Sequence, residues 1–480
     1  MTTTDGKAAQ PVRQLTTHRK LVSRTEQRKI DNRLTLDAIV VPASRQARNL
    51  DSAITLARAA RCALIILCSH QAAPDEVQRL LEDRSFDRAV VVDLPDNYGH
   101  RLLEFRALGS VKSKLPAACS YYTTNLSTKR NLGLLLALMV GWERIFFLDD
   151  DIRDIGHPDL QSTVSMLARY RTAGMPVTRF PDNSAACHAH RATRGAQDVF
   201  LSGSALAVDM QHNVGFFANI YNEDWLFFYD DAARGRLGSS TRKITQLVYD
   251  PFADPQRAAW QEFGDVLAEG LYALLDRGLG LEQATQEYWS DFLRARETFL
   301  RAILRRADTA KWEIRDQLLL SVKAALECSV TIEPRVLERY VRGWRRDLED
   351  WQQRVASIRQ MYTLRLALKE LGLAPSVYGH AVDTARPRPE VVSGGPPTVP
   401  YEPTVPYELS DLYELLDRAE IKDGSAAPDL PECGAGGLPL HRGSPGVRQG
   451  ARAATTWRGF RKPRRAYGQH ETGPASEAAG

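Results

Sequence analysis

Short apolar runs alternate with amphipathic segments from about residue 36 to residue 250. The runs are rich in Val, Ile, Leu and Phe, which is typical of buried strands, and the segments between them read as helices. The predicted strands are residues 38–41, 63–68, 89–92, 145–148 and 199–209, and the predicted helices are residues 49–60, 74–81 and 131–141. This alternation predicts an α/β fold with a mostly parallel mixed sheet flanked by helices.

The hydrophobic pattern changes after residue 254. Apolar residues such as Leu267, Leu271 and Leu274 then recur at helical spacing, with charged residues on the other faces. The pattern covers residues 262–275, 281–305, 311–327 and 334–371. It predicts an all-helical segment of four or five helices over residues 255–373.

Both ends of the chain lack these patterns. Residues 1–32 are polar and predict a flexible extension. Residues 374–480 are rich in Pro and Gly, contain a tandem repeat over residues 397–408, and suit a largely disordered tail. Residues 434–480 carry eight Lys and Arg against two Glu. Such a basic tail can contact nucleic acid, but a disordered tail without that role is the favoured interpretation.

The composition is that of an ordinary soluble protein, with 43% hydrophobic and 25% charged residues. The six cysteines are scattered without a C-x-x-C pair, which favours reduced core residues over a zinc site or a disulfide framework. The longest apolar run, residues 132–140, is too short to cross a bilayer, and the first residues contain no secretory signal. We therefore expect a cytoplasmic protein.

Three consecutive carboxylates, Asp149, Asp150 and Asp151, follow the predicted strand at residues 145–148. Ligands of open α/β sheets bind at the carboxyl ends of strands, where this triplet should lie. Three adjacent like charges repel one another unless a cation compensates them, and hard oxygen ligands suit Mg²⁺ or Mn²⁺. A solvated acidic turn is the alternative interpretation.

Three other segments could cooperate with the triplet. Lys129 and Arg130 lie in the first turn of a predicted helix, where they and the helix end would attract phosphate. Gly203, between two serines of a predicted strand, would allow close approach of a ligand or of another backbone. Glu223 and Asp224 form a carboxylate pair beside aromatic residues, which suits either a general base or a helix start.

Together these motifs resemble the family 2 type of glycosyltransferases, which have the GT-A fold. The order is the first-strand loop at residues 42–45, Arg-Asn-x-Gly at residues 130–133, Asp-x-Asp at residues 149–151, a glycine-bearing strand at Gly203, and Glu-Asp at residues 223–224. The resemblance covers about residues 36–250 and implies that residues 33–254 form a GT-A-like catalytic domain that binds a nucleotide-sugar.

The resemblance implies a metal-dependent transfer of sugar from a nucleotide-diphosphate-sugar to an acceptor hydroxyl. It implies donor contacts from Pro42, Ser44, Arg45, Asp93, Lys129, Arg130, Asn131, Asp149, Asp150 and Gly203. Asp149 and Asp151 would hold the Mn²⁺ or Mg²⁺. Asp224, next to Glu223, would act as the base of an inverting reaction. Tyr221 and Trp225 are candidates for a sugar subsite. The sequence names neither the acceptor, nor the nucleobase, nor the oligomeric state.

Three other readings compete with this one. A haloacid-dehalogenase-like phosphatase also places Asp-x-Asp after a strand, but Arg153 and the three earlier strands depart from its pattern. A Gly-rich phosphate loop after the first strand would favour a nucleotidyltransferase, but residues 43–45 contain no glycine. A catalytically inactive binding or scaffold protein on the same fold is the third reading.

Overall fold

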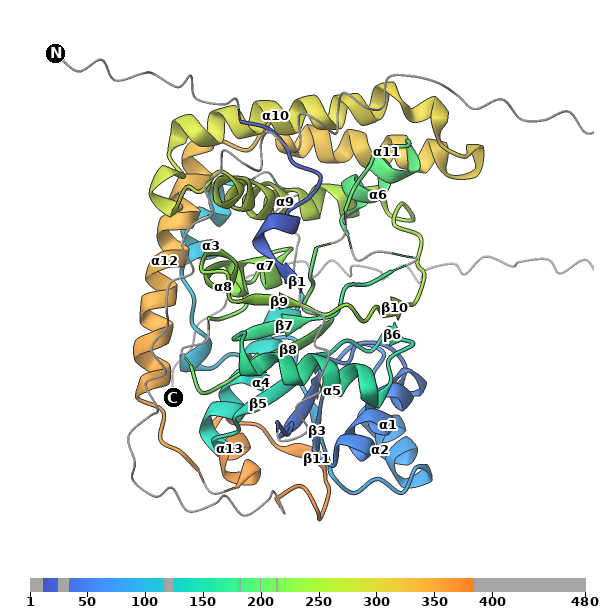
Figure 1. Cartoon of the computed structure of the whole chain (residues 1–480), viewed down its shortest axis with the longest axis vertical. Helices are drawn as coiled ribbons and strands as arrows, with labels where there is room; N and C mark the ends of the chain where they lie inside the picture. The colour runs from blue at the N-terminus through green and yellow to red at the C-terminus, as the bar shows by residue number, and fades with distance from the viewer. Residues whose placement is uncertain are drawn as a thin grey trace, which may run out of the picture. The chain divides into compact units, whose positions relative to one another are not determined.

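The computed structural model describes residues 12–24 and 34–383, apart from residues 116, 118–123, 179, 181–182, 199, 213–214 and 362. Within these residues, nine strands form one sheet in the order β1-β9-β7-β8-β5-β2-β3-β4-β11 (Figure 1). Neighbouring strands are parallel except where β8 pairs with β5 and β7 and where β11 pairs with β4. The α/β class and the mostly parallel mixed sheet are therefore confirmed.

The elements have the following bounds. The strands of the sheet are β1 Ser23–Arg24, β2 Ala38–Val41, β3 Ala63–Cys68, β4 Ala89–Asp93, β5 Arg144–Leu148, β7 Thr172–Gly174, β8 Ala205–Asp209, β9 Leu237–Ser239 and β11 Pro375–Tyr378, and a separate ribbon pairs β6 Ile152–Arg153 with β10 Thr245–Gln246. The helices are α1 Asp51–Ala60, α2 Pro74–Asp83, α3 Ala107–Val111, α4 Leu126–Val140, α5 His157–Ser165, α6 Ala185–Ala192, α7 Glu223–Phe227, α8 Tyr229–Ala233, α9 Pro255–Asp276, α10 Gln286–Arg305, α11 Trp312–Ser329, α12 Pro334–Ala356 and α13 Leu364–Glu370.

Alternate residues of the central strands serve two separate cores. Ile39 and Val41 of β2 point to the face covered by α1, α2 and α5, whereas Val40 points to the face that α4 and the later helices cover. A strand buried on both faces must be apolar at every position, which explains the continuous runs in the sequence. Gly133 of α4 lies so close to Val40 that an added Cβ would be 2.8 Å from its side chain.

The N-terminal residues that the structure describes belong to the sheet. β1 pairs in parallel with β9, and His18 is buried between Glu269 and Asp276 of α9. The flexible extension predicted for residues 1–32 is therefore wrong for residues 12–24. Two residues of strand pairing and one buried histidine with two ionic contacts leave no hydrophobic pattern in the sequence.

The helical segment also departs from the prediction. The helix expected over residues 334–371 ends with α12, and a separate short helix, α13, follows. β11 joins the sheet beside β4, so the tail boundary predicted at residue 374 is too early. Residues 1–391 form one compact unit, so the segment over residues 255–373 is not a separate domain. The tandem repeat and the basic tail lie outside the described residues.

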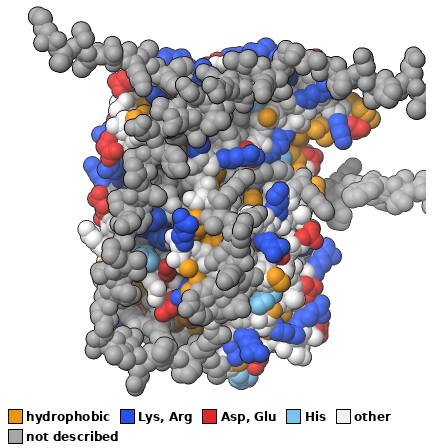
Figure 2. Space-filling model, viewed as in Figure 1, with side chains coloured by type: hydrophobic (Ala, Val, Ile, Leu, Met, Phe, Trp, Pro, Cys, Tyr) orange, Lys and Arg blue, Asp and Glu red, His pale blue; other side chains and the backbone are white. Residues whose placement is uncertain are grey.

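Charged side chains of both signs are interspersed over the face seen in Figure 2. None of the helices in the described part of the chain combines the length and apolar character needed to cross a bilayer.

Cys62, Cys68 and Cys187 are buried free thiols. Cys328 is disulfide-bonded, an exception to the expectation that most of the cysteines are reduced core residues.

Candidate active site

A cavity of about 530 Å³ opens where the order of the parallel strands reverses. The chain places β3 and β4 on one side of β2 and β5 on the other, and ligands of open α/β sheets bind at such a switch point. Most of the predicted site residues line this cavity. They are Pro42, Ser44, Arg45, Lys129, Arg130, Asp149, Asp150, Asp151, Glu223 and Asp224.

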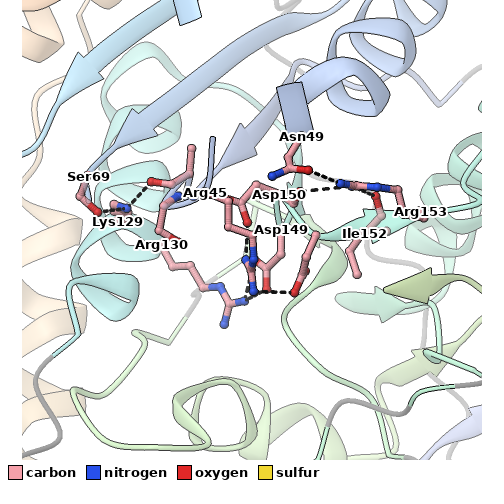
Figure 3. Close-up of polar contacts among 12 residues, drawn as sticks. Arg45, Asn49, Ser69, Lys129, Arg130, Asp149, Asp150, Ile152 and Arg153 are labelled. Atoms are coloured by element: carbon pink, nitrogen blue, oxygen red, sulfur yellow. Dashed lines mark hydrogen bonds and ion pairs between the residues drawn. The ribbon is translucent and has the colours of Figure 1, made fainter. Parts of the chain in front are cut away.

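The middle carboxylate of the Asp triplet is committed to the protein. Both backbone N–H groups of Ser44 and Arg45 donate to Asp150 Oδ2 at 2.7 Å, and the Arg45 guanidinium binds the other oxygen (Figure 3). The same guanidinium contacts Asp151 Oδ2 at 2.8 Å. Asp150 therefore fastens the loop after β2 to the end of β5. Its side chain is only 2% exposed, so it is not a free ligand for the cavity.

Arg130 joins the triplet to the later carboxylate pair. Its Nη2 donates to both oxygens of Asp149 at 3.0 Å (Figure 3). Its Nη1 donates to Glu223 at 2.7 Å. Burial opposes the charge, but the two carboxylates outweigh it and raise the pKa of Arg130 above its ordinary value. Arg130 thus remains a cation at every relevant pH.

Gly203 explains how Arg130 reaches this position. A Cβ at residue 203 would lie 2.5 Å from Arg130 Nη1, which is closer than atoms can approach. The structure therefore gives the glycine a packing role rather than a place in the cavity lining. The strand predicted over residues 199–209 is also corrected, because β8 begins only at Ala205. Residues 202–204 directly precede β8. The Gly203 N–H donates to Asp224 Oδ2 at 2.6 Å.

Lys129 has no carboxylate in direct contact among the described residues. Its Nζ donates to the Ala43 carbonyl and to Ser69 Oγ, both at 2.6 Å (Figure 3). Burial lowers the pKa of Lys129 to about 8, since neutral oxygens compensate the ammonium only in part. An anion in the cavity would stabilise its charged form.

Glu223 and Asp224 begin α7 and are both buried. Burial raises the pKa of each carboxyl, despite the nearby Arg130. Backbone N–H groups hold both oxygens of Asp224, from Gly203 at 2.6 Å and from Trp225 at 2.9 Å. A carboxylate with a raised pKa that faces a cavity has the properties of a general base.

The turn that presents this pair is fixed by α9. Asn222 adopts a left-handed conformation, with φ of 60°, and its amide donates to Asp265 at 2.9 Å. Asp265 accepts from the fully buried Arg296 at 2.8 Å. An added Cβ on Gly264 would lie 2.1 Å from the Tyr221 carbonyl oxygen, so α9 and this turn are in close contact.

Besides Gly203, two predicted donor contacts do not line the cavity. Asn131 is buried, where its amide exchanges two 2.8 Å hydrogen bonds with the backbone of Phe217. Asp93 lies at the exposed end of β4. Tyr221 and Trp225 do line the cavity, but Tyr249, Arg257 and Trp260 were missed. Arg257 and Trp260 belong to the first turns of α9. No motif in the sequence indicates that these turns pack beside the carboxyl ends of the strands.

The triplet is suited to a divalent cation only in part. Among the described residues, no group of three His, Cys, Asp or Glu side chains is arranged to hold a metal ion. The side chains of Asp149 and Asp151 are 20% and 11% exposed and line the cavity. Mg²⁺ is commonly held by one or two carboxylates together with substrate phosphates and water, so these two residues fit a cation that arrives with a diphosphate.

Comparisons with known proteins identify no relative. No protein-family model matches the chain, and a search of curated proteins finds no match. The function is therefore inferred from the geometry of the site.

Proposed function

We propose that this protein is a metal-dependent glycosyltransferase that moves a sugar from a nucleotide-diphosphate-sugar to an acceptor hydroxyl. One observation carries the proposal: a single cavity at the switch point is lined by three cations, by the carboxylates of Asp149 and Asp151, and by a buried candidate base. Arg45, Lys129 and Arg130 bring cationic groups to the cavity, and such groups bind phosphate oxygens. Asp224 lies in the first turn of α7, next to the Glu223 that Arg130 binds.

The basic residues would bind and orient the donor. Arg45 is 43% exposed and binds Asp150 and Asp151, so its guanidinium can also reach an incoming phosphate. Lys129 can donate its remaining N–H to the same group. Asp149 and Asp151 would hold Mn²⁺ or Mg²⁺. When bound, the cation would supply charge neutralisation of the departing nucleoside diphosphate.

Asp224 would remove the proton from the acceptor hydroxyl. As that oxygen attacks the anomeric carbon, the bond from the sugar to the diphosphate breaks and the proton passes to the Asp224 carboxylate. Attack from the side opposite the leaving group inverts the configuration. The raised pKa of Asp224 supports this role, because it makes the carboxylate a stronger base than an ordinary aspartate.

The test compares sugar release from a panel of nucleotide-sugars with Mn²⁺ or Mg²⁺. Asp224→Asn should lower turnover at least 100-fold and leave the affinity for the nucleoside diphosphate within about twofold. Asp230→Asn is the control, since the Asp230 side chain is 40% exposed and forms a surface ion pair with Arg234, just after α8. Turnover that survives in Asp224→Asn would refute the role of the base. Nucleotide binding without any turnover in the wild type would instead support a binding protein.

A further inference from the structure

The cavity extends beyond the reactive residues onto the first turns of α9. Arg257 and Trp260 line it there, together with Tyr249 from the segment after β10. All three side chains are partly exposed. These residues come from α9 and the segment before it, whereas Arg45 follows β2 and Lys129 belongs to α4.

Arg257 is a cation without an acidic partner in the part of the chain that the structure describes. Its guanidinium carbon lies 4.5 Å from the centre of the Tyr249 ring, which holds the group in place without neutralising it. Tyr249 is itself positioned, because its ring packs edge-on against Phe180, at 4.8 Å between ring centres. A planar guanidinium held in this way has N–H groups free for a carboxylate or phosphate.

Helical spacing places this cation near the candidate base. Arg257, Trp260 and Gly264 are three and then four residues apart, so they share one face of α9. Gly264 contacts the Tyr221 carbonyl, three residues before Asp224. Two helical turns, about 10.5 Å, separate the backbones of Arg257 and Gly264. Arg257, Trp260 and Asp224 line the same cavity.

We propose that this part of the cavity is the acceptor subsite and that it selects a sugar bearing an anionic group, either a carboxylate or a phosphate. The inference rests on the proposed transferase function, because only a transferase has an acceptor. Arg257 would bind the anionic group, Trp260 and Tyr249 would pack against the ring, and a hydroxyl would then face Asp224. Arg257 is thus a specificity determinant, whereas Asp224 performs the chemistry.

The experiment measures binding of three probes, glucuronate, glucose 6-phosphate and glucose, by saturation-transfer NMR on the full chain. At least one anionic probe should bind about 10-fold more tightly than glucose. Arg257→Gln should abolish that preference, and Arg257→Lys should keep part of it. Arg277→Gln is the matched control, because Arg277 is exposed at the other end of α9.

Three outcomes would overturn the proposal. Equal binding of all three probes to the wild type would remove the anion preference. A preference that persists in Arg257→Gln would place the anion elsewhere. A loss of affinity for UDP in Arg257→Gln, with sugar binding unchanged, would make Arg257 a donor contact. Since none of these measurements needs turnover, failure here is distinct from failure of the transferase proposal, which Asp224→Asn tests.

Discussion

Lys129 and Arg130 are neighbours in α4, yet their surroundings set their charges differently. Arg130 is held by two carboxylates, whereas Lys129 donates to a carbonyl and a hydroxyl. Burial therefore lowers the pKa of Lys129 to about 8, whereas the carboxylates raise that of Arg130. Only one of the two adjacent cations can lose its charge near neutral pH.

This difference predicts a bell-shaped pH profile for kcat/KM. The rate should rise with pH as Asp224 loses its proton, with a midpoint above the ordinary aspartate value of 3.8. It should fall again near pH 8, as Lys129 becomes neutral and donor binding weakens. The measurement is initial rate at low donor concentration between pH 4 and 10. In Lys129→Met the alkaline limb should vanish. A wild-type profile that stays flat above pH 8 would contradict the assignment.

Replacing Gly203 tests the packing of Arg130. The new Cβ in Gly203→Ala would displace the guanidinium from Glu223, so we expect a loss of about 1 to 3 kcal/mol in the free energy of unfolding. Urea denaturation provides the measurement. Gly109→Ala is the control, since a Cβ there meets no atom within 4 Å. Equal stabilities of Gly203→Ala and the wild type would show that the contact is not tight.

Among the elements, the strands buried on both faces could be predicted from the sequence and the short ones could not. The predicted bounds of β2 and β3 agree with the structure, because every residue of these strands is apolar. β1, β6, β9 and β10 have two or three residues each and pair only because the folded chain brings them together. The Asp triplet was placed correctly for the same reason, since it directly follows a buried strand.

The candidate site was predicted only where it lies on the sheet. Strand ends converge at one edge, so sequence order alone brings residues 42–45 and the triplet together. Arg257 and Trp260 reach the cavity because α9 packs against the Asn222 turn. That contact depends on the buried Arg296 and on the left-handed backbone of Asn222. Neither feature produces a hydrophobic periodicity from which it could be predicted.

The contact between His18 and α9 should make stability depend on pH. Burial alone would lower the pKa of His18, but Asp276 and Glu269 outweigh it and raise the pKa from 6.5 to about 9. The stabilisation should therefore be complete below pH 6.5 and disappear as the pH rises through 9.

Urea unfolding of His18→Gln and wild type at pH 6 and pH 9.5 tests this. The difference between the two proteins should be larger at pH 6, by up to about 3 kcal/mol. His212→Gln, whose ring is 61% exposed, should change stability by less than about 1 kcal/mol at either pH. A pH-independent difference for His18→Gln would mean that the histidine is not charged in the fold.

At the scale of the whole molecule, the cores on the two faces of the sheet share its strands, so the edges of the sheet matter. β11 pairs with the outer edge of β4, and Gly379 lies so close to Asp87 that an added Cβ would be 2.0 Å from the carbonyl oxygen. Residues 1–391 form one compact unit that includes β11. The end of that unit therefore protects an edge that would otherwise expose unpaired backbone groups.

Two truncated chains test this edge. A chain that ends after residue 391 should melt within about 2 °C of the full chain, as monitored by circular dichroism. A chain that ends after residue 373 loses β11 and should melt several degrees lower, because β4 loses its partner and its cover. Identical melting of the two truncated chains would show that β11 contributes nothing to stability.

The position of β1 has a consequence for the order of events during biosynthesis. His18 leaves the ribosome early, but its partner Asp276 is 258 residues further along the chain. At about 5 to 20 residues per second, that interval is on the order of 10 to 50 s. Residues 12–24 must wait throughout, since β9 and α9 do not yet exist. The first described segment to be synthesised is thus among the last to be locked into place.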